Sequence, residues 1–229
     1  MTVIVLLLLG WAIDTGARAA AQSVVAGTIQ QSQQLKDKPT VAVRGWFFLA
    51  QAVRGRYDDV DVTLHGLHQG PLHLSTVTAH LRGVQVPLKS VLSGRVSRIA
   101  VDQSAEVVTL TYADLNAYLK SQGKDVTVSA GPPGELKVTG QLNLFGQSVA
   151  LSADAVVRPG SGELQITPTQ LDTGTALDGV SRDLVNKRFT FAISTAPFPF
   201  GQRVTSIEPT ANALTVQASG SDVVLSATS

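Results

Sequence analysis

The spacing of apolar residues along the chain changes near Pro39. Before this point, apolar and small residues recur at spacings of three and four between residues 13 and 29, and an apolar run, Val3–Ile13, precedes them. Such spacing marks one face of a helix, so we predict a helix that runs to about Gln34. If this helix continues back through the leucines, roughly 30 residues at 1.5 Å each make a rod about 45 Å long.

Beyond Pro39 the period is two, which predicts β-strands. Val60–Leu64 alternates with polar residues, and a one-residue shift near Ser75 separates Leu72–Leu74 from Val77–Leu81. Further strands are predicted at Ile99–Val101, Val107–Leu110, Val126–Val128, Leu136–Leu144, Val149–Val157, Leu164–Ile166, Phe189–Ile193, Leu214–Ala218 and Val223–Leu225. We therefore expect a mostly antiparallel sheet whose strands are joined by tight turns.

Two short helices are predicted between the strands. In the first, Thr111 is a capping residue, Asp114 follows three positions on, and Gly123 is a stop signal. The second covers Val180–Lys187. Because no linker or low-complexity segment divides the chain, residues 14–229 are predicted to form one α+β domain, in which a long N-terminal helix is wrapped by a strongly curved, mostly antiparallel sheet.

The lining of such a sheet bears on function. Its inward positions are mainly Val, Leu and Ala, and aromatic residues make up only 5% of the chain. A sheet that covers a long apolar helix would curl around it, and a lining of small side chains would leave a slot of lipid-chain size. A completely filled core fits the same composition equally well, so both interpretations stay open.

The overall composition excludes several classes of function. The chain carries 18 basic and 17 acidic residues, for a formal net charge of +1, without long runs of like charge. It therefore lacks the basic footprint of a nucleic-acid-binding protein. Cysteine is absent, which excludes disulfides, thiolate metal sites and a catalytic cysteine.

The N-terminal apolar run resembles part of a targeting segment. Val3–Ile13 is about half of the ~20 residues that span a bilayer. No basic region precedes it, and the residues from Ala17 onward only approach a signal-peptidase cleavage site. We interpret residues 1–13 as the remainder of a signal peptide or membrane anchor, and the alternative is one half of a buried N-terminal helix.

Catalytic motifs are weak. Asp14–Gly16 and Asp172–Gly174 repeat the tripeptide Asp-Thr-Gly, which pepsin-like proteases use to pair two carboxylates. Asp14 lies in an apolar helical run, so we expect a helix-surface aspartate there and a loop at Asp172. No nucleophile elbow, P-loop or dinucleotide motif is present. We predict no catalytic residue, and a hydrolase built on Asp172, Asp178 or Asp154 is the alternative.

Residue types that commonly bind metals gather between residues 58 and 80, but they match no known metal-binding motif. Four histidines lie close together in the sequence, at His65, His68, His73 and His80. We expect His65 and His73 to face solvent, and no carboxylate or cysteine stands at ligand spacing among the four. Asp58–Asp61 lacks the glycine and distal glutamate of an EF-hand, which favours a solvated strand start. We therefore predict no metal and no cofactor.

Two stretches carry a family resemblance. In "VRGWFFLAQAVRGRYDDVDVTL" the matching positions are Gly45, Phe48, Leu49, Gln51, Gly55, Tyr57, Val60 and Val62. Trp46 and Phe47 depart from the pattern, which has Phe and Pro there. The second stretch, Thr195–Leu225, has a closing turn with Pro197, Pro199, Phe200 and Gly201, followed by a strand pair. Together they resemble the LmeA-like phospholipid-binding family of actinobacterial envelope proteins.

This resemblance implies a non-enzymatic lipid-binding protein outside the cytoplasmic membrane. It implies an exported or membrane-anchored chain in the cell envelope or periplasmic space, with a fold like that of tubular lipid-binding proteins. Phospholipid and the membrane surface are the implied partners, and nucleic acid is not among them. Related proteins are connected with the assembly of envelope glycolipids or polysaccharides, so the enzymes of that biosynthesis are further implied partners.

The aromatic run of the first stretch then has a physical meaning. Consecutive residues point in different directions, so Trp46, Phe47 and Phe48 cannot all face a core. Tryptophan favours the boundary between membrane and water, and nearby arginines could meet anionic headgroups, namely Arg44, Arg54 and Arg56. We predict that residues 44–57 form the lip of a lipid pocket and dock on a bilayer. The alternative is a buried loop that closes one end of the barrel.

The lipid itself is predicted to lie in a slot between the long helix and the inner face of the sheet. Burial of acyl chains there, at about 0.8 kcal/mol per CH₂, would hold a lipid without any catalytic group. The predicted lipid-binding residues are Val24, Ile29, Trp46, Phe47, Phe48, Leu49, Leu142, Leu151, Phe189 and Phe191. The alternative function is a structural scaffold of the envelope, with a filled core and no lipid.

Overall fold

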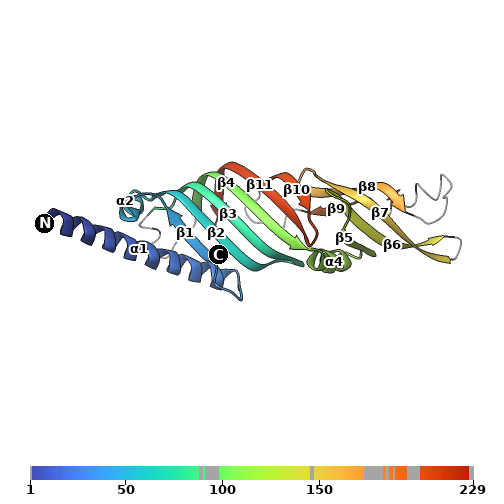
Figure 1. The fold of residues 1–229 in the computed structure, drawn as a ribbon, viewed down its shortest axis with the longest axis horizontal. Helices are drawn as coiled ribbons and strands as arrows, with labels where there is room; N and C mark the ends of the chain where they lie inside the picture. Colours follow the sequence, from blue (N-terminus) through green and yellow to red (C-terminus); the bar gives the residue numbers. More distant parts are fainter. Residues whose placement is uncertain are drawn as a thin grey trace. The chain divides into compact units, whose positions relative to one another are not determined.

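The structure is a computed structural model that describes residues 2–87, 90, 98–144, 147–172, 183, 186–187, 189–194 and 202–226 (Figure 1). Its helices include α1 (Thr2–Ser32), α2 (Phe48–Arg54) and α4 (Tyr112–Ser121). Its strands include β1 (Thr40–Arg44), β2 (Arg56–Gln69), β3 (Leu72–Gln85), β4 (Arg98–Thr111), β5 (Val126–Ala130), β6 (Leu136–Leu144), β7 (Gln147–Pro159), β8 (Glu163–Asp172), β9 (Phe191–Ser194), β10 (Arg203–Pro209) and β11 (Ala213–Ser226). The α+β fold class is confirmed.

The strands form two antiparallel sheets. The first has the order β1-β2-β3-β4-β11-β10, and the second has the order β5-β6-β7-β8-β9. Strands that follow one another in the chain are mostly neighbours, because turns such as the one at Gly70, with its left-handed φ of 58°, reverse the chain tightly. The six-stranded sheet is strongly curled (Figure 1), as the prediction of a curved sheet required.

Contacts between residues divide the chain into two compact units. Unit 1 comprises residues 1–67, 76–106 and 219–229, and unit 2 comprises residues 68–75 and 107–218. Unit 1 therefore holds α1, β1 and α2, and unit 2 holds α4 and the five-stranded sheet. The prediction that residues 14–229 are one lipid-binding domain stays a prediction.

Helix α1 runs from Thr2 to Ser32, so the predicted helix continues back through the leucines, which the sequence alone left open. It ends in a Schellman motif, in which Gln34 adopts a left-handed φ of 52° and the Leu35 amide donates to the Gln30 carbonyl at 2.9 Å. Leu35 is buried, so the chain leaves the helix in a fixed direction toward β1. Helix α1 contacts both β1 and α2 within unit 1.

Much of the apolar surface of α1 faces solvent. Trp11 is 65% exposed, and the exposed side chains of this helix also include Leu9, Ile13, Val24 and Val25. Within the described part of the chain, no helix has the length and apolar character needed to cross a bilayer. The buried contacts of α1 are instead made by small or polar residues, such as Ala26 and Asp14.

The strands of the six-stranded sheet depart from simple alternation at two places. The phase shift predicted near Ser75 is confirmed, because the buried positions of β3 change from Leu72 and Leu74 to Val77 and Ala79. The segments predicted as two strands, Ile99–Val101 and Val107–Leu110, are parts of the single strand β4. Two buried polar residues, Ser104 and Glu106, interrupt the apolar pattern of this strand and explain the wrong division.

Other strand predictions differ in similar ways. Val223–Leu225 belongs to the same strand as Leu214–Ala218, because both are parts of β11. β10 was not predicted by periodicity, although the family resemblance placed a strand pair there. The second short helix, Val180–Lys187, and the closing turn of the second stretch lie largely outside the described residues.

In unit 2, the predicted strands Leu136–Leu144 and Val149–Val157 are neighbours, as parts of β6 and β7. β6 and β7 pair from Leu136 opposite Ala155 to Leu144 opposite Gln147. Gly140, which interrupts the apolar face of β6, makes room for an aromatic ring, since a Cβ there would lie 3.0 Å from Cε1 of the buried Phe189. Helix α4 begins as predicted, with the Asp114 amide donating to Thr111 Oγ1 at 3.1 Å.

Candidate functional site

The aromatic run forms an exposed turn rather than part of a core. Trp46 is 86% exposed and Phe47 is 50% exposed, and their rings stack with centroids 5.7 Å apart. Phe48 turns inward and packs its ring 6.0 Å from that of Tyr57. The run therefore divides between surface and interior, as the argument from side-chain direction required, and the alternative of a buried loop is wrong.

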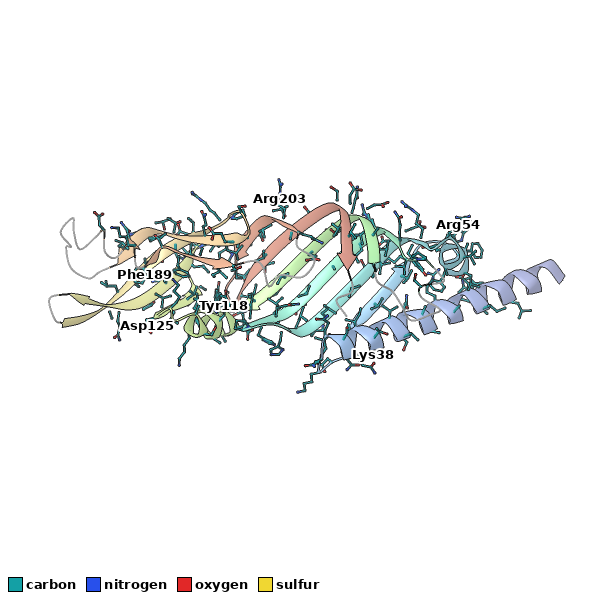
Figure 2. The ribbon with its side chains drawn as sticks, turned by 180° about the vertical axis from the view of Figure 1, so that it is seen from behind. Lys38, Arg54, Tyr118, Asp125, Phe189 and Arg203 are labelled. Carbon is teal, nitrogen blue, oxygen red and sulfur yellow. The ribbon has the colours of Figure 1, made fainter. Side chains whose placement is uncertain are left out.

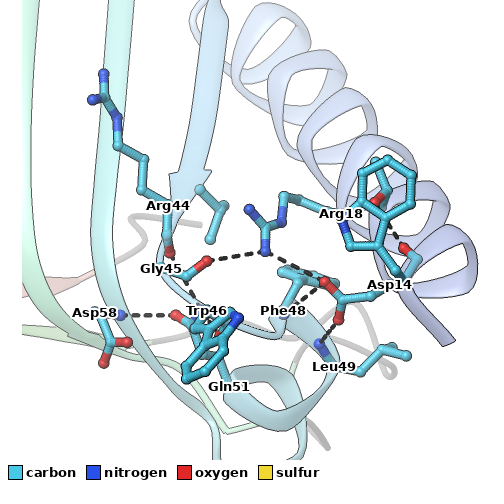
Figure 3. A network of polar contacts seen from close by, with 12 residues as sticks. Asp14, Arg18, Arg44, Gly45, Trp46, Phe48, Leu49, Gln51 and Asp58 are labelled. Atoms are coloured by element: carbon cyan, nitrogen blue, oxygen red, sulfur yellow. Dashed lines mark hydrogen bonds and ion pairs between the residues drawn. The ribbon is translucent and has the colours of Figure 1, made fainter. Parts of the chain in front are cut away.

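Helix α2 follows this turn, and its N-terminus is capped by another helix. Its own N-cap residue, Phe47, offers no side-chain hydrogen bond. Asp14 of α1 supplies the acceptors, because its carboxylate receives the Phe48 amide at 3.0 Å and the Leu49 amide at 2.8 Å (Figure 3). A side chain distant in sequence thus performs the task that a local Ser, Thr, Asp or Asn performs at most helix starts.

Asp14 itself is only 6% exposed. Arg18, one helical turn later, lies 3.3 Å from the Asp14 carboxylate and also donates to the Gly45 carbonyl at 3.1 Å (Figure 3). The Leu49 amide foremost, then the Phe48 amide and the Arg18 charge, hold the pKa of Asp14 below its ordinary value against the opposing effect of burial. The expectation of a helix-surface aspartate is wrong, because the tertiary partner α2 covers this carboxylate.

The turn is held from its other side by Gln51. This side chain is 4% exposed, and its amide nitrogen donates to the carbonyls of Arg44 at 3.2 Å and Trp46 at 3.1 Å, while its oxygen accepts from the Asp58 amide at 2.9 Å. Gly45 has a φ of 100°, and a Cβ at this position would lie 2.8 Å from the Gln51 nitrogen. Conformation and space therefore both require glycine here.

Exposed apolar side chains extend from the turn along one side of α2. We call this set the aromatic edge, and it comprises Trp46, Phe47, Leu49 and Val53. Leu49 and Val53 are four positions apart on the helix, and Val53 is 75% exposed. The opposite side of α2 is buried through Phe48, Gln51 and Ala52.

A pocket of about 320 Å³ opens beside the aromatic edge. Its lining residues are Trp46, Phe47, Ala50, Gln51, Arg54, Arg56 and Asp58. Two of the three predicted headgroup arginines, Arg54 and Arg56, are thus brought together here. The third, Arg44, points toward the strands and pairs with Asp61 at 2.6 Å.

The predicted lipid-binding residues fall into both units. In unit 1, Val24 is exposed and Ile29 is half-buried on α1, and Trp46–Leu49 forms the turn described above. In unit 2, Leu151, Phe189 and Phe191 are all buried. The side chain of Leu142 lies outside the described residues. Their role in lipid binding stays a prediction.

Comparison with known proteins decides the family. A family model described as LmeA-like phospholipid-binding matches residues 12–219. The chain belongs to the LmeA-like phospholipid-binding family. The match contains Asp14, the aromatic edge and the Arg54–Arg56 turn, and it confirms the resemblance seen in the two sequence stretches. Searches of curated proteins and of solved structures each found no match.

For this LmeA-like protein, the family description names binding of phospholipid and names no catalysis. Asp14 is engaged by Phe48 and Leu49 and is not presented as half of a protease pair. His73 and Ser75 both bind Asp114, at 2.8 and 2.9 Å, rather than each other, so they do not form a nucleophile and its base. Asp178, of the hydrolase alternative, lies outside the described residues.

One polar cluster in this LmeA-like protein was missed from the sequence. His80 on β3 binds Asp61 on β2 and lies 3.5 Å from Asp59, and the three ligand atoms are close enough together to hold a metal ion. Burial acts to raise the pKa of Asp61, but the His80 hydrogen bond and the Arg44 charge outweigh it, so this pKa is lower than usual. Asp59 and Asp61 are half-buried, which corrects the expectation of a solvated strand start.

This cluster has a structural explanation. Arg44 supplies a positive charge to Asp61. Oδ1 of Asp59 is buried and accepts no hydrogen bond from the described residues. Sequence spacing concealed the cluster because its members meet across neighbouring strands, and only the pairing of β2 with β3 brings His80 to them. His65 is exposed as expected, whereas His73 is half-buried against Asp114. The prediction of no metal stays a prediction.

Proposed function

We propose that this protein binds phospholipid while it is docked on a membrane through the aromatic edge, and that it transfers or presents that lipid within the cell envelope. The observation that carries the proposal is the Trp46 ring, which is 86% exposed although buried polar side chains hold the turn around it. Gln51 donates to the Trp46 carbonyl, and Asp14 accepts from the Phe48 amide. A turn held this firmly around an exposed tryptophan is suited to insertion into an interface.

The chemistry of the aromatic edge supports a bilayer as its partner. Exposed apolar side chains that gather on one surface mark interaction sites in soluble proteins. Tryptophan partitions to the headgroup level of a membrane because its ring is apolar and its N–H is a donor. Arg54, on the same helix, adds a cation that favours an anionic surface.

We further propose that the acyl chains lie between α1 and the inner face of the curled sheet. Buried residues of this sheet in unit 1 include the aliphatic side chains of Leu64, Val77 and Leu81. Because α1 contacts β1 at the edge of the sheet, a shift of this helix would give lipid access to that face. Burial of each CH₂ group there would contribute about 0.8 kcal/mol.

Localisation outside the cytoplasmic membrane, with residues 1–13 as a signal peptide remainder or anchor, completes the proposal. Exposed Leu9, Trp11 and Ile13 at the start of α1 are compatible with contact to lipid, and they lie within one helical turn or two of Asp14. A role beside the enzymes that assemble envelope glycolipids or polysaccharides follows from the family resemblance. No catalytic step is proposed.

The docking step is tested with phospholipid vesicles. We expect the double variant Trp46→Ser, Phe47→Ser to bind vesicles at least about tenfold more weakly than the wild type, because two aromatic rings no longer enter the interface. Co-sedimentation at increasing lipid concentration measures this change. The matched control is Val107→Ser, Val224→Ser, which also removes two exposed apolar side chains but lies outside the aromatic edge. Equal vesicle affinity of both double variants would contradict docking by this edge.

The cargo is tested by native mass spectrometry. We expect the full chain, purified from a host with membranes, to carry a phospholipid that organic extraction releases. A second sample, stripped of lipid and mixed with vesicles, should regain the lipid mass. Persistence of the lipid-free mass in both samples would favour the alternative of a scaffold with a filled core, for which the burial of Leu64, Val77 and Leu81 is the supporting observation.

A further inference from the structure

We propose that the pocket beside the aromatic edge is a headgroup site that binds the phosphate of an anionic membrane phospholipid through Arg54 and Arg56. This inference rests on the proposed docking of the aromatic edge on a membrane and adds a ligand chemistry to it. The pocket would give the docked protein a preference for bilayers that contain anionic lipid.

The pocket has the size and rigidity of a binding site. Its volume of about 320 Å³ lies near the lower end of the range for small-ligand pockets, ~300–1,000 Å³. Gln51 forms a fixed wall, because all three of its hydrogen bonds go to backbone groups, those of Arg44, Trp46 and Asp58. A small side chain, Ala50, leaves the space between this wall and the aromatic turn open.

The two arginines are presented by an anchored reversal of the chain. Arg54 ends α2, Gly55 adopts a left-handed φ of 65°, and Arg56 begins β2. The Gly55 carbonyl accepts from the Val86 amide at 2.9 Å, and a Cβ on Gly55 would lie 3.0 Å from the Val86 carbonyl oxygen. This close backbone contact holds the reversal in place, so the bases of both arginine side chains are fixed at one end of the pocket.

The charge of the lining favours an anion. The lining contains two arginines, Arg54 and Arg56, and one acidic residue, Asp58. Among the ion pairs of the described residues, Arg54 has no carboxylate partner, and Arg56 is paired with Asp102. Both members of that pair are substantially exposed, so exchange of Asp102 for a phosphate oxygen costs little. Guanidinium groups bind phosphate in a bidentate manner, which an ammonium cannot do.

The position of the pocket favours a lipid headgroup as the source of this phosphate. Trp46 and Phe47 line the pocket and also belong to the aromatic edge, so a phosphate bound here lies next to the side chains that would enter the bilayer. Figure 2 shows Arg54 beside α2, at the end of the sheet where this edge lies. A phospholipid whose chains remain in the membrane would therefore reach the arginines with its headgroup.

The test compares full-length proteins on vesicles of phosphatidylcholine alone and of phosphatidylcholine mixed with phosphatidylglycerol, at constant ionic strength. We expect the wild type to prefer the mixed vesicles, and Arg54→Gln to lose roughly fivefold of that preference. Arg54→Lys keeps the charge but not the planar group, so its preference for the mixed vesicles should lie between those of Arg54→Gln and the wild type. The matched control is Arg82→Gln, because Arg82 is an exposed arginine of β3 outside the pocket, and it should keep the preference.

The outcomes separate this inference from the proposed function. If the wild type binds both kinds of vesicle equally and firmly, or if Arg82→Gln and Arg54→Gln lose the preference to the same extent, the headgroup site is excluded and docking stands. If the wild type binds neither kind of vesicle, docking is excluded and the site falls with it. Calorimetric titration with glycerol 3-phosphate distinguishes the source, since tight binding of this soluble phosphate that Arg54→Gln abolishes would overturn the assignment to a membrane lipid.

Discussion

The free energy of unfolding is expected to fall by several kcal/mol between pH 5 and pH 8 because of one buried side chain, Glu106. This glutamate is 2% exposed and lies on the inner side of β4 together with Ser104. Burial disfavours its charged form and raises its pKa from 4.5 to about 8. The effect on stability is large because each unit of difference in pKa corresponds to about 1.4 kcal/mol.

The direction follows from the proton balance. Above pH 4.5 the glutamate ionises in the unfolded chain, whereas in the folded protein it keeps its proton up to about pH 8. Between these values the folded state binds the extra proton, so stability decreases as the pH rises and becomes level above the folded pKa. The contribution of Glu106 to the free energy of unfolding is therefore largest at acidic pH, below the pKa of the unfolded chain.

The variant Glu106→Gln measures this contribution. It keeps the shape and a hydrogen-bonding head but cannot ionise, so we expect it to be more stable than the wild type at pH 8 and less dependent on pH. Urea denaturation at several pH values from 5 to 8 gives the free energies. Glu208→Gln, an exposed glutamate of β10, is the control and should follow the wild type. Parallel pH profiles of Glu106→Gln and the wild type would contradict the prediction.

Removal of the Asp14 carboxylate is expected to release the aromatic edge. In Asp14→Ala the amides of Phe48 and Leu49 lose their acceptor, and Arg18 loses its ion pair. Hydrogen bonds to a charged group are among the stronger ones in proteins. We therefore expect these two amides to exchange with solvent roughly 10- to 100-fold faster, as measured by hydrogen exchange.

The same change should weaken binding to vesicles, because the aromatic turn would no longer be held in its exposed conformation. Asp14→Asn, which keeps one acceptor oxygen without the charge, should give an intermediate result. Thr15→Ala is the matched control on α1, since its hydroxyl bonds only within the helix, to the Trp11 carbonyl. Unchanged exchange of Phe48 and Leu49 in Asp14→Ala would show that α2 holds itself without this cap.

Acidification should reproduce part of this effect in the wild type. The pKa of Asp14 is lowered in the folded protein, chiefly by the Leu49 amide. Its contribution to stability is therefore present above the unfolded value of 3.8 and is lost as the pH falls through the lower folded value. Asp14 and Glu106 thus respond to pH in opposite directions, which allows their contributions to be separated.

Local signals in the sequence were sufficient for the elements and the family. The period of three to four predicted the part of α1 from Ile13 onward, the cap at Thr111 predicted the start of α4, and alternation predicted most strands. These signals act between residues a few positions apart, where backbone geometry alone determines which side chains share a face. The two motif stretches were likewise sufficient for the family, because motifs are properties of the chain itself.

The sequence-based predictions were wrong about buried polar residues, whose partners lie far away along the chain. Asp14 reads as a surface residue of α1, and only the approach of α2, some 34 positions later, turns it into a buried cap. Ser104 and Glu106 read as a break between two strands, although they lie inside one. A buried polar group is stable only with partners, and those partners are not encoded in its neighbours along the chain.

Local patterns in the chain thus predict a long helix, an antiparallel sheet and an aromatic turn that cannot be wholly buried, and the two motif stretches identify the phospholipid-binding family. The tertiary structure alone decided that α1 caps α2 through Asp14, that His80 meets Asp61, and that Arg54 and Arg56 share a pocket with Trp46. These two sets of features differ in how far apart along the chain the interacting residues lie. Periodicity and capping depend on adjacent residues, whereas these contacts exist only once separate elements have packed against one another.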